Sequence, residues 1–109
     1  MAGEAMETDA QVDDQDMPPE DTTGPQLYDG ATLKRLRLRR RMDVERIEEI
    51  TKIRVPQIVA LEESDYPSLP PSVFLRGFLR AYAICLDLEP DKVVNDYMDG
   101  YDAWRRLRV

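Results

Sequence analysis

The sequence predicts an all-α fold of five helices. From residue 29 onward, apolar residues recur at spacings of three and four, which is the pattern of a helix with one buried face. Aspartates that can cap a helix precede two of these segments, and prolines either separate the segments or fall in their first turns. The chain has 109 residues, which is enough for one domain.

The N-terminal segment differs sharply from the rest of the chain. Of the 22 acidic residues, nine lie in residues 1–30, which contain no basic residue, so residues 31–109 carry 13 acids against all 15 bases. Residues 1–28 are therefore predicted to be a disordered acidic tail, because they cannot bury enough apolar surface to offset the entropy of ordering. Two roles are open: solubility, or competition with anionic partners for the basic face of the body.

The first two helices are predicted from their caps and apolar stripes. Asp29 or Thr32 caps the first helix, whose inward residues are Leu33, Leu36 and either Leu38 or Met42. Asp43 caps a short second helix, whose inward residues are Val44, Ile47 and Ile50. The segment from Thr51 to Ile53 is then expected to be a tight turn.

Prolines delimit the remaining helices. A third helix is predicted from about Arg54 to Glu63, with Pro56 in its first turn, and the three prolines in residues 64–71 predict a loop. A fourth helix covers residues 73–86, and Pro90 begins a fifth. Gly100 weakens the fifth helix, so the expected domain is 29–100, followed by a basic helix end at 101–109 that is free to fray.

The second and third helices have the spacing of a helix-turn-helix. The apolar contacts that two crossed helices need fall on Ile47, Ile53, Ile58 and Leu61. Two positions depart from the usual pattern. Glu48 occupies a position that is usually small, and Lys52 occupies a turn position usually given to glycine, so we expect an altered crossing or a side chain that reaches outward.

The longer context resembles the cytoplasmic domain of the bacterial cell-shape RodZ family. The resemblance covers about residues 30–98 and is carried by Thr51–Arg54, Leu61–Tyr66, Leu69–Pro70 and, most specifically, Phe74–Ala83. It implies a five-helix bundle containing a degenerate helix-turn-helix. It also implies a domain that binds the bacterial actin MreB, largely through the fourth helix, with aromatic contacts that fall on Phe74 and Phe78. RodZ proteins continue into a membrane span and a periplasmic domain, so this chain is either a fragment or a member in which the domain stands alone.

The fourth helix is also the best candidate binding surface on its own residues. Leu75, Leu79, Tyr82 and Leu86 already supply an inward stripe, which leaves Phe74 and Phe78, one turn apart, to form an exposed patch. Packing of both rings in the core is the alternative. Arg76 and Arg80 would flank the patch and steer association, and Tyr82 would lie at its rim or in the core.

DNA binding is the competing hypothesis. The basic residues of the first helix would contact phosphates or an acidic protein partner, or else form a solvated face; they are Lys34, Arg35, Arg37, Arg39, Arg40 and Arg41. On the third helix only Arg54 and Gln57 suit base recognition, whereas Glu62 and Glu63 would repel phosphates. The first choice is therefore an adaptor for an actin-like filament, and the runner-up is a DNA-binding regulator.

Composition argues against an enzyme and for a cytoplasmic protein. The chain has no histidine, no Gly-rich phosphate loop and no Cys/His cluster, so no catalytic residue, metal or cofactor is predicted. Cys85, the single cysteine, is expected to be buried and inert, which fits a reducing compartment. The basic C-terminal end would suit either the inner face of a membrane, if the chain continues beyond Val109, or a solvated helix end.

Overall fold

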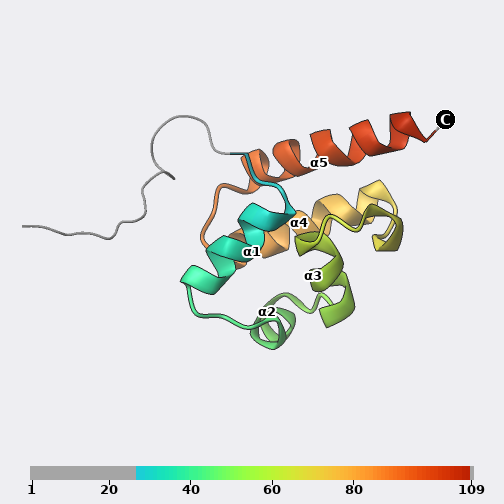
Figure 1. Cartoon of the computed structure of the whole chain (residues 1–109). Coiled ribbons are helices and arrows are strands. Elements are labelled where there is room, and N and C mark those ends of the chain that lie inside the picture. Colours follow the sequence, from blue (N-terminus) through green and yellow to red (C-terminus); the bar gives the residue numbers. More distant parts are fainter. Residues whose placement is uncertain (1–26, 109) are drawn as a thin grey trace, which may run out of the picture.

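The computed structural model describes residues 27–108, which form five α-helices and one short 3₁₀ helix (Figure 1). The elements are α1 (Gly30–Arg39), α2 (Val44–Thr51), α3 (Val55–Glu62), η3 (Tyr66–Ser68), α4 (Ser72–Cys85) and α5 (Pro90–Leu107). Within these residues there is no β-strand, so the predicted all-α fold of five helices is confirmed. The predicted acidic tail lies outside the described residues, except for Leu27 and Tyr28.

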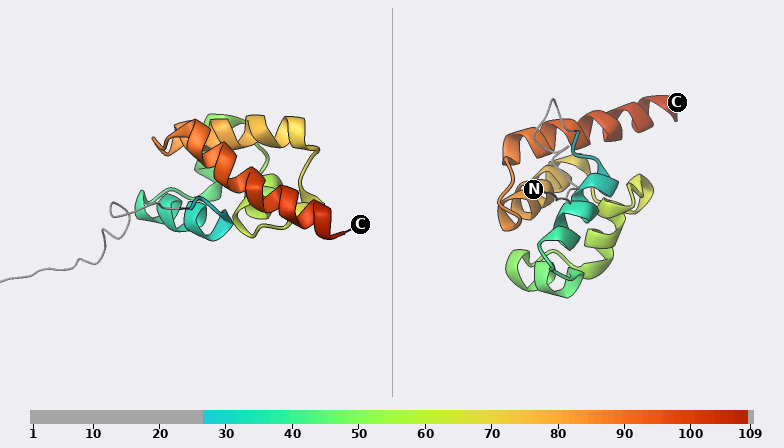
Figure 2. Two further views of the ribbon diagram at one scale, coloured as in Figure 1. Left: turned by 90° about the horizontal axis from the view of Figure 1, so that it is seen from above. Right: turned by 60° about the vertical axis from the view of Figure 1, so that its left-hand side comes forward.

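The helices pack around one core that lies between α4 and the other elements. α4 packs against α5 on one side and α2 on the other, while α3 packs against α1 and α2. α5 lies along one side of the bundle, and its C-terminal end extends beyond the other helices (Figures 1 and 2). The fully buried side chains include Leu33, Ile47, Ile58, Leu61, Leu75, Leu79, Tyr82, Leu86 and Val93.

The helix starts follow the local chemistry of the sequence. Asp29 caps α1, because its Oδ1 accepts a hydrogen bond from the Thr32 amide at 2.9 Å. Asp43 caps α2 in the same way, through the Arg46 amide at 2.8 Å. Prolines lie in the first turns of α3 and α5. Proline is tolerated there because an amide in the first turn has no acceptor within the helix, so its absence costs no helical hydrogen bond. Both predicted aspartate caps are thus confirmed.

The helix-turn-helix turn is built around the two unusual residues, Glu48 and Lys52. Glu48 turns outward to the start of α3, where its Oε2 accepts a hydrogen bond from the Val55 amide at 3.0 Å and lies 3.4 Å from Arg54 Nε. Lys52 ends α2 in the left-handed conformation, with φ of 70°, where glycine would be unstrained. A carboxylate cap therefore joins the two helices at a position that is usually small.

Two predicted inward positions are wrong. Ile50 is 47% exposed and Leu38 is 54% exposed, whereas Met42, the alternative to Leu38, is partly buried against the core. Ile50 lies at the edge of the apolar stripe of α2, where spacing alone does not determine which way a residue faces. Leu38 lies on the outer face of α1, because the five residues from Leu33 turn the helix by about 140°.

α5 continues without a break past Gly100, contrary to the expected fraying there. Tyr66 of the 3₁₀ helix packs edge-on against Tyr101 at 5.8 Å between ring centroids and lies 5.5 Å from the Trp104 ring. Tyr101 is buried, so residues beyond 100 contribute to the core. The aromatic contacts compensate for the weak helix propensity of Gly100.

Candidate protein-binding surface

The outer face of α4 exposes an aromatic side chain at its N-terminal end. Phe74 is 61% exposed and its neighbour Val73 is 69% exposed, although both stand on a helix whose opposite face is fully buried. Solitary exposed apolar residues are ordinary, so two large ones in succession at a helix start mark this end of α4 as a candidate contact surface. The predicted surface position of Phe74 is confirmed, and its role as a partner contact stays a prediction.

Phe78 is less exposed than predicted. It is half-buried and packs against the core cluster, so only part of its ring reaches the surface. The expected pair of exposed rings is therefore one exposed ring followed, one turn later, by a partly covered one. The two side chains still lie on neighbouring parts of one helix face, because residues four apart in a helix are neighbours.

The two predicted flanking arginines are both on the surface. Arg76 is exposed, and Arg80 donates from Nη1 to Asp91 Oδ1 at 2.6 Å. Both members of that ion pair are more than half exposed, so the pair is weak and can exchange for contacts with a partner.

Tyr82 is not a surface residue, which corrects its assignment to the binding patch. Its side chain is fully buried, and its hydroxyl donates to Glu62 Oε2 at 2.6 Å and lies 3.2 Å from the Leu33 carbonyl oxygen. Burial, with the nearby Glu62 carboxylate, raises the pKa of Tyr82 far above its ordinary value. This tyrosine therefore links three helices inside the bundle.

Arg37 is likewise removed from the predicted basic surface. Its Nε and Nη2 donate to the two Glu62 carboxylate oxygens at 2.6 and 2.9 Å, and its Nη1 donates to the Met42 carbonyl oxygen at 2.7 Å. Both side chains are buried, and the hydrogen bond to Glu62 is the main cause that raises the pKa of Arg37. Glu62, expected on the outer face of α3, is thus a core residue.

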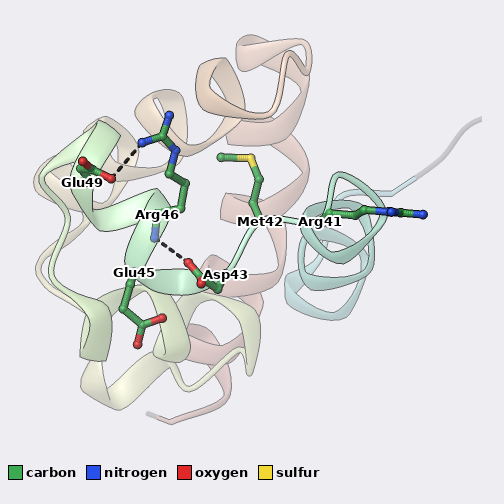
Figure 3. A pocket seen from close by; sticks show the side chains of 6 residues that line it. All are labelled: Arg41, Met42, Asp43, Glu45, Arg46 and Glu49. Atoms are coloured by element: carbon green, nitrogen blue, oxygen red, sulfur yellow. Dashed lines mark hydrogen bonds and ion pairs between the residues drawn. The ribbon is translucent and has the colours of Figure 1, made fainter.

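The remaining cations of α1 and of the two residues that follow it lie outside and form what we call the α1 basic surface. Its members are Lys34, Arg35, Arg39, Arg40 and Arg41. Arg40 is 3.8 Å from Asp87, a weak and exposed ion pair. Arg41 points away from the depression at the α1–α2 junction, where Arg46 is held by Glu49 at 2.9 Å (Figure 3). This surface can attract an anionic partner, but it offers no enclosed site.

The outer face of α3 presents few side chains that could form hydrogen bonds with a DNA base. Arg54 is exposed and lies beside Glu48, while the Gln57 amide nitrogen donates to the Ser68 carbonyl oxygen at 3.3 Å. Ala60 and Glu62 are buried, so neither belongs to this face. Of the two residues predicted to read bases, Gln57 is bonded within the protein and Arg54 is exposed in a weak ion pair. The other exposed side chains of this surface include the apolar Val59 and the acidic Glu63, neither of which specifies a base.

No group with the features of a catalytic centre is seen in residues 27–108. Cys85 is half-buried, less than predicted, and burial raises the pKa of its thiol, which disfavours the reactive thiolate. No cluster of three or more potential metal ligands occurs in this range. None of the described helices is long and apolar enough to cross a membrane.

Comparison with known proteins gives concordant matches. A family model described as "Helix-turn-helix domain" matches residues 32–93. The cytoskeleton protein RodZ of Streptococcus pneumoniae is 28% identical over 74 residues, which is 68% of this chain but only 25% of that protein. The solved structure of YmfM from Staphylococcus aureus, proposed to be a DNA-binding membrane protein, is 30% identical with a TM-score of 0.59, covering 64% of this chain and 85% of that one.

Proposed function

The chain belongs to the RodZ-like helix-turn-helix domain family, and from this premise we propose that it is a non-enzymatic adaptor that binds a protein partner through α4. The observation that carries the proposal is the exposure of Phe74 on a helix that is otherwise firmly anchored. Aromatic side chains, phenylalanine among them, are enriched in the cores of protein–protein interfaces, where a few residues carry most of the binding energy.

The anchoring of α4 makes Phe74 an effective contact. Leu75 and Leu79, on the inner face, are fully buried, so the backbone beneath the ring does not have to be ordered when a partner arrives. A side chain presented in this way loses little conformational entropy on binding. Arg76, beside the ring, adds a positive charge that speeds the approach of an acidic surface.

The proposed partner is an actin-like cytoskeletal filament, MreB in bacteria that have it. Two things support this choice. The named relative is a cytoskeleton protein, and the resemblance of Phe74–Ala83 to the RodZ family implies filament contacts on Phe74 and Phe78. The proposed setting is the cytoplasm, at the inner face of the membrane in longer family members. The chain spans about a quarter of the length of that relative. Filament binding is therefore a proposal for this chain.

The test is co-sedimentation of the full chain with polymerised actin homologue from the same organism. Phe74→Ala is expected to weaken binding at least about tenfold, and Phe74→Ala with Phe78→Ala further, because the ring that a partner would cover is lost. Leu38→Ala is the matched control, since Leu38 is similarly exposed but lies on α1. Unchanged binding in the double variant would rule out α4 as the binding surface. If the intact chain does not bind the filament, the filament is ruled out as the partner.

A DNA-binding regulator is the second candidate, favoured by the α1 basic surface and by the description of the related structure. Gel-shift titrations with duplex DNA at rising salt separate the two functions. We expect weak retention that is lost at moderate salt and does not depend on sequence, because phosphate contacts release counterions and carry no base information. Sequence-selective retention at physiological salt would instead favour the regulator.

A further inference from the structure

The positive charge of the α1 basic surface is largely uncompensated by its surroundings. Residues 30–42 contain six cations and no carboxylate. One of these cations, Arg37, is buried with its own partner, and the other five are exposed. Within residues 27–108, Lys34, Arg35 and Arg41 form no ion pair with a carboxylate. The described part of the chain therefore leaves an attractive field for anions along the outside of α1.

The sequence that precedes the described residues has the opposite charge. Residues 1–26 contain eight acidic residues and no basic one. Five of the eight lie within the nine residues 13–21, so the negative charge is densest in the half of this sequence that is nearer to α1. Runs of like charge are often interaction segments. Charge complementarity thus makes residues 13–21, which we call the acidic segment, the candidate occupant of the α1 basic surface.

The point at which the chain enters the fold is fixed beside α1. The Tyr28 amide donates to Asp96 Oδ2 at 3.1 Å. Lys92 Nζ donates to the same oxygen at 2.7 Å and lies 5.5 Å from the centroid of the Tyr28 ring. These contacts hold the residue that lies two positions before α1 against α5. The sequence before Tyr28 therefore starts at the N-terminal end of the helix that carries the cations.

The acidic segment can reach every cation of the α1 basic surface. Eight residues, 22–29, separate Asp21 from Gly30, and a chain of eight residues spans up to about 25–30 Å. α1 has ten residues and is therefore only about 15 Å long. Exposed ion pairs are individually weak. A tether of this length compensates for that weakness, because it gives the segment an effective concentration on the order of mM at its target.

The basic C-terminal end of α5 is a less suitable target for the same segment. Arg105 lies 5.9 Å from the centroid of the Tyr101 ring, and Arg108 lies 4.9 Å from that of the Trp104 ring, so both guanidinium groups already have partners on their own helix. Asp102 lies one turn before Arg105, and its charge offsets the positive charge there. Residues 30–42 contain no such carboxylate, which favours α1.

We propose that the acidic segment docks on the α1 basic surface and competes with anionic ligands for it, as an autoinhibitory contact within the chain. An anionic ligand then binds α1 only by displacing residues 13–21, so the acidic sequence limits access to this surface in addition to any effect on solubility. The proposal does not rest on the filament proposed above, because it concerns α1 and its tests do not involve α4.

Paramagnetic broadening of amide signals in the full chain tests the docking directly. Gln15→Cys combined with Cys85→Ala places a nitroxide label within the acidic segment without changing its charge. At low salt the signals of residues 34–41 should be broadened more than those of residues 105–108, the other basic cluster. The difference should vanish at high salt and in the variant Lys34→Glu, Arg35→Glu, Arg41→Glu, because screening or charge reversal removes the attraction.

Three results of this experiment would overturn the proposal. The first is equal broadening of the two basic clusters, and the second is no broadening of residues 34–41 at low salt. The third is equally strong broadening when the label and the isotope enrichment are on different molecules, because a second copy of the chain would then supply the segment.

A second measurement leaves Cys85 in place and uses short duplex DNA as the anionic probe, in a fluorescence titration at low salt. The variant Asp16→Asn, Glu20→Gln, Asp21→Asn should bind the DNA at least about threefold more tightly than the variant Glu4→Gln, Glu7→Gln, Asp9→Asn, because only the first weakens the competing segment. Both variants lose three negative charges, so their net charges are equal. Equal affinities would show that net charge alone controls binding, which would overturn the proposal.

Discussion

Glu62→Ala is expected to lower the free energy of unfolding by about 3–5 kcal/mol, the range found when one member of a buried ion pair is removed. The substitution leaves the Arg37 guanidinium buried without its carboxylate and also removes the shorter of the two contacts of the Tyr82 hydroxyl. A small domain has a total stability of about 5–15 kcal/mol, so a loss of this size brings it near the unfolding threshold.

Urea unfolding followed by circular dichroism measures the effect, and the chain offers its own control. Glu63→Ala removes the next carboxylate along the chain, which is exposed, and should change stability by no more than about 0.5 kcal/mol. Replacing both partners, Arg37→Met with Glu62→Leu, should recover most of the loss, because no charge is then left unpaired. A loss below about 1 kcal/mol for Glu62→Ala would show that water reaches the site and that the ion pair is not structurally important.

Gly30→Ala is expected to destabilise the domain by about 2–3 kcal/mol, in the range of overpacked cores. α1 begins directly against the end of α3, and a Cβ on Gly30 would lie 2.5 Å from the Leu61 carbonyl oxygen and 2.6 Å from that of Glu62. Both oxygens belong to the backbone of α3, so relief requires a shift of the whole helix rather than a rotation of a side chain.

Gly77→Ala is the matched control, because a Cβ at that exposed helical position meets nothing within 4 Å. There the substitution should stabilise the domain by up to about 1 kcal/mol, which is the difference in helix propensity between alanine and glycine. Thermal melts of both variants should therefore move in opposite directions. A Gly30→Ala variant as stable as the parent chain would show that the α1–α3 contact is looser than the structure indicates.

The sequence predicted the helices well because their ends depend on local chemistry. Asp29 and Asp43 act through amides three residues away, and Pro56 and Pro90 act through their own backbone, so no distant contact is needed to place them. Phe74 was likewise predicted to be exposed once a full inward stripe had been assigned to the other face of α4. Local rules therefore predicted the architecture and one part of the candidate surface.

The polar core could not be predicted in the same way. Arg37 and Glu62 are 25 residues apart, and each alone has the composition of a surface residue. Only their approach across the α1–α3 interface makes burial favourable, and one sequence carries no local signal for such a pair. The same reasoning applies to Glu48. An outward side chain was one of the two alternatives predicted there, but its cap on α3 depends on where that helix begins. For Arg37 alone there was a hint, because it follows Leu33 by four residues and therefore shares the inward face of α1.

The link formed by Arg37, Glu62 and Tyr82 has a consequence for how α4 meets a partner. Apolar contacts let packed helices slide or rotate by small steps at little cost, but charge-assisted hydrogen bonds fix direction as well as distance. The angle between α4 and the α1 basic surface is therefore held to a narrow range before any encounter. We expect association to resemble the docking of two rigid bodies, with mutations in the outer surface changing the dissociation rate far more than the association rate.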